Sequence, residues 1–347
     1  MSKNITENKM KRMQKLANDK GIITALALDQ RGSLVKALQK ATKNAGKDFD
    51  MEMVYDFKKI VISVLSSYSS AVLLDEQMGF KAIKAKDPKT GLIMSYEETG
   101  YDVDTPGRLP RLIPNQSAQI MIEKGADALK VLIYYNPNDS DEINDVKKAF
   151  AQRYGTEAMA AEVPTFFEVV TYDDKYASDS LEFAKEKPQL VIDSMKEFTK
   201  DIYHIDVLKM EMPFNYKYIA GWNDDPDGQS AYTEEDAKKY LRDLSDAATR
   251  PFIFLSGGVP TNVYQRELKL AGDANVAFSG VLSGRATWAD GVDIFVNEGE
   301  AGLTAWLETQ GKQNVEDLNE ILSTTAKPWY DIYGGMDELE IIKRPKL

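Results

Sequence analysis

The sequence contains no cysteine among its 347 residues and only one histidine, His204. The first absence excludes disulfide bonds, thiolate nucleophiles, iron–sulfur clusters and thiolate zinc sites. The second excludes zinc sites built on two or three histidines, although a Ser–His–Asp arrangement could still use the single one. Acid–base or nucleophilic chemistry must therefore come mainly from Lys, Asp, Glu, Ser or Tyr, and we expect neither a metal ion nor a cofactor.

Long apolar runs and an excess of positive charge are also missing. No segment approaches the roughly 18 apolar residues that a membrane span needs, and the polar start lacks the apolar core of a signal peptide. The 55 acidic residues outnumber the 43 basic ones, which gives a net charge of −12. That balance argues against broad binding to nucleic-acid phosphates. We expect a cytoplasmic protein that binds neither membranes nor nucleic acid.

Eight short apolar segments rich in β-branched and aromatic residues recur along the chain, with amphipathic helical segments between most of them. Strands that alternate with helices favour a parallel sheet, and eight strands close a barrel. The sequence therefore predicts a single (β/α)8 TIM barrel over residues 1–330, with 331–347 as a C-terminal extension of unknown role. The expected strands are 22–28, 71–75, 92–96, 128–135, 164–172, 205–212, 251–258 and 278–284. The expected helices include 52–67, 115–124, 142–153, 188–201, 234–247, 262–270 and 314–324.

Charged residues lie inside or at the end of these apolar strands. They are Asp29, Lys130, Glu168, Lys209 and Glu211. Because alternate strand residues share a face, Lys209 and Glu211 point to the same side. Burying an unpaired charge costs several kcal/mol, so these groups must pair or change protonation. They form either a structural ion-pair network or an active site, and the number of charges on four strand ends favours the active site.

Two lysines close together indicate a particular chemistry. A desolvated lysine beside another cation has a lowered pKa and carries a free amine near neutral pH. Such an amine attacks a ketone or aldehyde to form a Schiff base, and the resulting iminium accepts electrons when a neighbouring C–C bond breaks. A carboxylate must move protons during the dehydration step. The pattern predicts a lysine-dependent lyase.

Glycines and an arginine follow the last two expected strands. Ser256, Gly257 and Gly258 follow the seventh strand, and Gly284 and Arg285 follow the eighth. These loops are the frequent phosphate site of a TIM barrel. Glycine lets backbone N–H groups approach phosphate oxygens, and arginine can bind them through two hydrogen bonds. We therefore expect a phosphorylated carbonyl substrate.

Several segments together resemble the bacterial class I, lysine-dependent tagatose 1,6-bisphosphate aldolases over roughly residues 8–330. They are ALALDQRG (25–32), ALKVLIYY (128–135), IDVLKMEMP (205–213), FLSGGV (254–259) and GVLSGRATWADGV (280–292). The resemblance implies a (β/α)8 barrel that cleaves tagatose 1,6-bisphosphate to dihydroxyacetone phosphate and glyceraldehyde 3-phosphate. It places the protein in the tagatose 6-phosphate route of lactose and galactose use.

The resemblance also implies residue roles. Lys209 matches the Schiff-base lysine, Glu168 the proton shuttle, and Lys130 the second lysine, which tunes Lys209 and orders Glu168. Asp29 matches the carboxylate that faces the substrate hydroxyls. The residues that match phosphate or substrate contacts are Ser256, Gly257, Gly258, Gly284, Arg285, Gln30 and Arg31.

Alternatives remain at the level of single residues. Glu211 rivals Glu168 as the acid–base group and ranks second, because a solvated or ion-paired role is easy near Pro213. Asp75 and Glu76 end the second strand and are possible substrate contacts. His204 precedes the sixth strand, where a structural or surface role is expected.

Alternatives also remain at the level of function. A class I aldolase for fructose 1,6-bisphosphate or a sulfonated ketose phosphate would share nearly all of these contacts. A catalytically weak sugar-phosphate sensor on the same fold is a further alternative. In each case the ligand is a small sugar phosphate, and we expect a homo-oligomer, with a dimer favoured.

Overall fold

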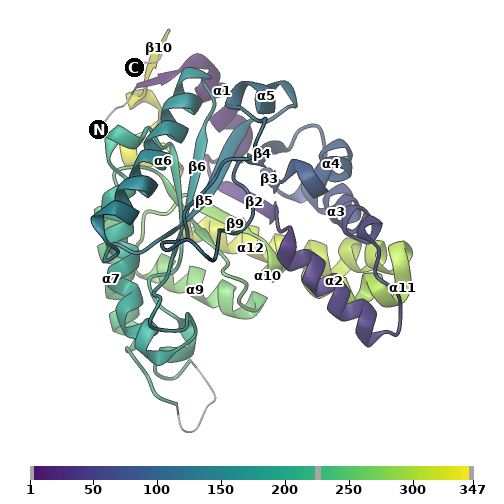
Figure 1. The fold of residues 1–347 in the computed structure, drawn as a ribbon. Coiled ribbons are helices and arrows are strands. Elements are labelled where there is room, and N and C mark those ends of the chain that lie inside the picture. Colours follow the sequence, from purple (N-terminus) through teal and green to yellow (C-terminus); the bar gives the residue numbers. More distant parts are fainter. Residues whose placement is uncertain (1–3, 223–227, 344–347) are drawn as a thin grey trace.

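The computed structural model describes residues 4–222 and 228–343, and its centre is a closed barrel of eight parallel strands (Figure 1). The strands follow chain order around the ring. They are β2 (Ile23–Leu28), β3 (Ala71–Leu74), β4 (Gly91–Ser95), β5 (Ala128–Tyr135), β6 (Thr165–Thr171), β7 (Val207–Met210), β8 (Phe252–Leu255) and β9 (Gly280–Ser283). All eight predicted strands are present, and the predicted (β/α)8 barrel is confirmed.

The pairing of β2 with β9 closes the ring, with Ile23 opposite Gly280. Gly280 has a φ of +135°, and a Cβ atom there would lie 1.9 Å from the carbonyl oxygen of Ile23. Only glycine tolerates both the backbone conformation and this close approach. The closure of the barrel therefore depends on a residue without a side chain at this position.

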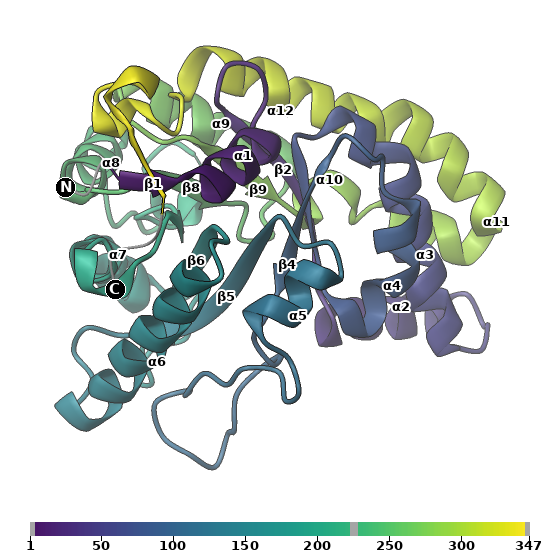
Figure 2. The same ribbon diagram turned by 90° about the horizontal axis from the view of Figure 1, so that it is seen from above.

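Helices surround the barrel, as the view in Figure 2 shows. Among the described residues they are α1 (Glu7–Leu16), α2 (Gly32–Asn44), α3 (Met51–Leu65), α4 (Glu76–Ala85), α5 (Ala118–Glu123), α6 (Asp141–Ala160), α7 (Leu181–Phe198), α8 (Glu234–Ala247), α9 (Thr261–Asp273), α10 (Arg285–Trp288), α11 (Gly291–Trp306) and α12 (Lys312–Thr325). Helices α1, α2, α10 and α11 are additional to those expected from the sequence, and α4 lies where the interval 75–92 leaves room for a short helix. Within the described residues, no helix combines the length and the apolar character needed to cross a membrane.

Apolar side chains fill the lower part of the barrel interior. Ala128, Phe166 and Val207 are completely buried there, on β5, β6 and β7. Two residues further along the same strands and on the same face come Lys130, Glu168 and Lys209. The interior thus has an apolar floor directly below a layer of charge.

The two ends of the described chain meet at the amino end of the barrel. β1 (Asn4–Thr6) pairs in parallel with β10 (Glu340–Ile342), which lies at the upper left of Figure 1. Tyr333 is 8% exposed and packs into the same apolar cluster as α1 and the barrel floor. The segment expected as an extension of unknown role, 331–347, therefore covers the bottom of the barrel where it is described.

Candidate active site

A cavity of about 420 Å³ opens at the carboxyl ends of the strands. Every residue to which the resemblance assigns a role lines it. These residues are Asp29, Gln30, Arg31, Lys130, Glu168, Lys209, Ser256, Gly257, Gly258, Gly284 and Arg285. Residues from opposite ends of the chain thus meet in one place, while their individual roles stay predictions.

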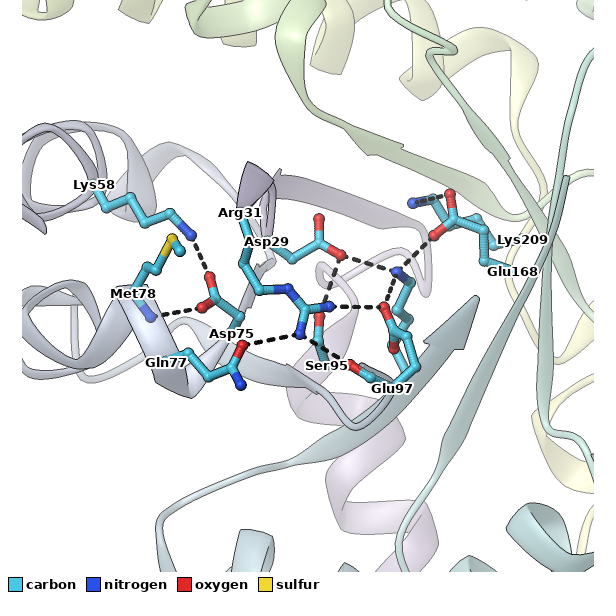
Figure 3. Close-up of polar contacts among 11 residues, drawn as sticks. Asp29, Arg31, Lys58, Asp75, Gln77, Met78, Ser95, Glu97, Glu168 and Lys209 are labelled. Carbon is cyan, nitrogen blue, oxygen red and sulfur yellow. Dashed lines mark hydrogen bonds and ion pairs between the residues drawn. The ribbon is translucent and has the colours of Figure 1, made fainter. Parts of the chain in front are cut away.

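Glu168 lies between the two lysines. Its Oε1 is 2.9 Å from Nζ of Lys209, and its Oε2 is 2.9 Å from Nζ of Lys130. Glu168 and Lys209 are register partners on neighbouring strands, and Figure 3 shows their side chains directed toward each other. All three side chains are at least nine-tenths buried. One carboxylate therefore bridges two ammonium groups away from bulk water.

The two lysines differ in the number of carboxylates around them. Nζ of Lys130 lies 2.9 Å from an oxygen of each of Asp29, Glu97 and Glu168. An ammonium group has three N–H donors, so all of them have acceptors here. Burial lowers the pKa of Lys130, but the three carboxylates outweigh it and the net pKa lies well above its usual value. Lys130 is thus a fixed cation, and among the described residues only Glu168 forms an ion pair with Lys209.

The pKa values of the neighbouring carboxyl groups are shifted in opposite directions. Burial raises the pKa of Glu168, but the charges of Lys130 and Lys209 outweigh it and the net pKa is lowered. Burial likewise opposes the lowered pKa of Asp29, which Lys130, Lys209 and Arg31 bring about. For Glu97, burial dominates and raises the pKa against the charges of Lys130 and Arg31. Asp29 and Glu168 are therefore held as carboxylates.

Glu97 was not predicted from the sequence. It follows β4, its Oε1 contacts Lys130, and its Oε2 is buried without a hydrogen-bond partner among the described residues. Arg31 donates to the backbone oxygen of Glu97 at 2.9 Å and lies 3.4 Å from its Oε1 (Figure 3). Arg31 is 4% exposed, so much of its bonding capacity is directed at the protein. It braces Glu97, in addition to the substrate contact predicted for it.

The predicted phosphate loops lie against each other. Gly257 and Gly258 have φ values of +59° and +78°, and a Cβ atom on Gly258 would lie 2.5 Å from the guanidinium of Arg285. The N–H of Gly284 donates to Oγ of Ser256 at 3.4 Å. The absence of a side chain at Gly258 thus lets Arg285 approach the loop after β8, and Gly257 takes a left-handed backbone conformation in the same turn.

The other charged residues lie elsewhere or are occupied. Oε2 of Glu211 accepts from the N–H and Oγ1 of Thr171, both at 2.7 Å, and Lys187 pairs with its Oε1. Asp75 is fully buried, caps α4 and forms an ion pair with Lys58, outside the cavity (Figure 3).

His204 lies before β7, at the opposite end of the barrel from the cavity. Across residues 4–222 and 228–343, no group of three or more His, Cys, Asp or Glu side chains is arranged to hold a metal ion.

The chain is similar over nearly its full length to aldolases from two bacteria. A "Tagatose 1,6-diphosphate aldolase" of Listeria innocua is 46% identical over 341 residues, which cover 98% of this chain and 99% of the relative. "Tagatose 1,6-diphosphate aldolase 1" of Enterococcus faecalis is 45% identical over 325 residues, which cover 93% of this chain and 97% of the relative.

A solved structure of a fructose-bisphosphate aldolase from Plasmodium falciparum shares the fold. Its TM-score is 0.62 at 15% identity, and the match covers 92% of this chain and 95% of the other. The family model described as "DeoC/LacD family aldolase" matches residues 23–290, which include every lysine, carboxylate and phosphate loop of the cavity. The chain belongs to the DeoC/LacD family of aldolases.

Proposed function

We propose that this protein is a class I aldolase, a carbon–carbon lyase that cleaves tagatose 1,6-bisphosphate to dihydroxyacetone phosphate and glyceraldehyde 3-phosphate. The observation that carries the proposal is the contact of Lys209 with a buried carboxylate that a second lysine also holds. The names of the relatives at about 45% identity support the choice of substrate. No cofactor or metal ion takes part.

The ion pair between Lys209 and Glu168 contains the proton that the first step needs. Transfer of this proton from the ammonium to the carboxylate leaves a free amine beside a carboxylic acid. The amine attacks C2 of the ketose, and one of its protons moves to the carbonyl oxygen to give a carbinolamine hydroxyl. Glu168 then returns the first proton to this hydroxyl as it departs, so that water and an iminium form. The cation and the carboxylate are both present again at the end of this step.

The same carboxylate then serves C–C cleavage. Glu168 takes the proton of the C4 hydroxyl, the C3–C4 bond breaks, and its electrons move into the iminium to give an enamine. Glyceraldehyde 3-phosphate leaves, Glu168 protonates C3, and water releases dihydroxyacetone phosphate from Lys209. Asp29, a partly buried carboxylate next to Lys130, orients the substrate hydroxyls.

Reductive trapping tests the covalent step. Borohydride in the presence of substrate or dihydroxyacetone phosphate should inactivate the enzyme and add mass to the peptide that contains Lys209. Labelling of Lys130 would exchange the roles of the two lysines. Without any labelling, the Schiff-base mechanism would be wrong.

A kinetic comparison tests the substrate. We expect tagatose 1,6-bisphosphate to be cleaved, and values of kcat/KM for it, for fructose 1,6-bisphosphate and for a sulfonated ketose phosphate measure the preference. The two bisphosphates differ at one hydroxyl, on C4, so the contacts around that hydroxyl decide the ratio. A folded protein that binds these ketoses without turnover would be a sensor.

The proposed reaction indicates the compartment and the pathway in which the protein acts. We infer that it acts in the cytoplasm, in the tagatose 6-phosphate route of lactose and galactose use. Its partner is a small sugar phosphate, with no role for membranes or nucleic acid, and we propose that it works as a homo-oligomer, with a dimer favoured. Light scattering on the purified protein measures the oligomeric state.

A further inference from the structure

A ketose bisphosphate carries a phosphate at each end, whereas the loops after β8 and β9 provide one phosphate site. These loops lie next to β7, where Lys209 is the register partner of Ile253 on β8. The phosphate on C1 is the one adjacent to the C2 carbonyl that Lys209 attacks. The site at Ser256 and Arg285 therefore suits the phosphate on C1, and the phosphate on C6 needs a cation elsewhere.

The strand order shows where that cation must lie. In the closed ring, β4 is across the barrel from β8, and β5 is across from β9. A substrate that extends from the loops after β8 and β9, over Lys209, reaches the β4 and β5 side of the cavity. Arg108, in the loop between β4 and α5, lines the cavity there.

The other basic residues of the cavity have different partners. Of the five basic side chains that line it in the described part of the chain, Arg31, Lys130 and Lys209 contact buried carboxylates. Arg285 belongs to the loops after β8 and β9. Arg108 is the remaining cation, and its only ion pair among the described residues is with Asp174, at 3.0 Å. The Asp174 side chain is 66% exposed, and such exposed pairs are weak.

Aromatic rings hold Arg108 in place. Its guanidinium carbon lies 4.0 Å from the ring centre of Tyr172, and 5.4 Å and 5.7 Å from those of Tyr101 and Tyr134. The preceding Gly107 has a φ of +92° and packs directly on Ile143. Stacking of this kind fixes the plane of a guanidinium and leaves its edge free for the two-point hydrogen bonding that phosphate favours.

We propose that Arg108 binds the distal phosphate of the ketose bisphosphate, the one that leaves with the aldehyde product. Phosphate displaces Asp174 and binds the guanidinium of Arg108, which the aromatic rings already hold in a fixed orientation. Arg108 thereby selects bisphosphates over ketose 1-phosphates. This inference rests on the proposed aldolase function and adds a specificity residue to it.

Two substrates and four variants test the proposal. Tagatose 1,6-bisphosphate and tagatose 1-phosphate differ only in the distal phosphate. Arg108→Gln should raise KM for the bisphosphate by about tenfold to a hundredfold, which corresponds to about 1.5–3 kcal/mol for a hydrogen bond to a charged group, and should leave the 1-phosphate unchanged. Arg285→Gln should weaken both substrates. Asp174→Asn, the matched control, should keep the preference for the bisphosphate.

The outcomes separate this inference from the function on which it rests. If the wild type cleaves neither substrate, the proposed function fails, and the role of Arg108 fails with it. If the wild type is active and Arg108→Gln changes both substrates equally, or neither, the aldolase proposal stands and the role of Arg108 is wrong. Arg108→Lys, which keeps the charge, should retain more of the preference than Arg108→Gln at an unchanged melting temperature.

Discussion

At the scale of single residues, the number of acceptors around each lysine decides what that lysine can do. Lys130 has three carboxylates within 2.9 Å, so no N–H is left for a substrate and its positive charge is permanent. Lys209 has one such partner, which can receive its proton. A single cluster thus contains one lysine suited to electrostatics and one suited to covalent chemistry.

Lys130→Met tests this division. Glu168 and Asp29 lose a cation that holds their pKa values down, so both pKa values should rise and both groups should deprotonate only at higher pH. The acidic limb of the rate profile should therefore move to higher pH. Turnover should fall by about a hundredfold or more, the range for lost acid–base catalysis. The measurements are kcat against pH and the melting temperature of the same variant.

Lys58→Met is the matched control. Lys58 and Asp75 form an equally buried ion pair that does not reach the cavity. Loss of the Lys58 ammonium should cost about 3–5 kcal/mol of unfolding free energy, because the buried carboxylate of Asp75 is left without a countercharge. Any loss of activity should then follow the folded fraction, with an unshifted pH profile. If Lys130→Met behaved in the same way, Lys130 would be purely structural.

The sequence allowed the strand charges to be predicted because a charge inside an apolar strand stands out. Glu97 was missed because it follows its strand, in SYEETG, where an acidic residue resembles an ordinary polar loop. Arg31 was predicted to contact the substrate because it adjoins Asp29. Its bracing of Glu97 depends on a contact across 66 residues that no local pattern shows.

At the scale of elements, the strands were predictable and some helices were not. A strand of a barrel is buried on both faces, so it appears as a continuous apolar run with turn residues at its ends. α2 carries only a narrow apolar stripe of Leu34, Leu38 and Ala41, and Gly299 interrupts α11 with a φ of +74°. The loop that carries Arg108 has no periodic pattern, and only the fold brings it to the cavity.

Helix α9 contains a buried acid that makes stability depend on pH. Glu267 is 3% exposed, and burial raises its pKa to about 8, against a partial effect of Lys187. Between its usual value near 4.5 and 8, the folded protein binds a proton that the unfolded chain has lost. Stability should therefore fall as pH rises through this window. Glu267→Gln should remove the effect and stabilise the protein by roughly 2–4 kcal/mol at pH 8.

Urea unfolding at pH 5 and pH 8 measures the difference. The control is Glu308→Gln, which changes an exposed glutamate and should shift the free energy of unfolding by less than about 0.5 kcal/mol at either pH. Equal pH dependence in the wild type and in Glu267→Gln would show that Glu267 is ionised in the folded protein.

At the scale of the whole molecule, composition leads to a prediction about metals. One histidine and no cysteine leave few of the ligands that zinc prefers. Treatment with EDTA should therefore leave activity unchanged. The measurement compares kcat of the untreated enzyme with kcat after treatment and removal of the chelator. A loss of activity that added zinc restored would show that the reaction depends on a metal ion.

The C-terminal segment should contribute to stability, not to chemistry. Tyr333 is buried below the barrel floor, far along the strands from the cavity. Tyr333→Ala should cost about 3 kcal/mol of unfolding free energy, the usual range for removing a large buried side chain. KM and kcat should stay at wild-type values below the melting temperature. A changed KM would connect the bottom of the barrel to the active site.

Because β2 pairs with β9, the barrel can close only after most of the chain has been synthesised. β2 is the first strand of the barrel to be synthesised, and its second neighbour ends at Ser283. Until then, the growing sheet has an unpaired edge at Ile23–Leu28, and open edges of this kind invite pairing with other chains. Contacts between strands so far apart in the sequence form slowly, because the intervening chain must close into a loop before the contacts add stability. Newly made chains should therefore need protection from aggregation until residue 283 has emerged.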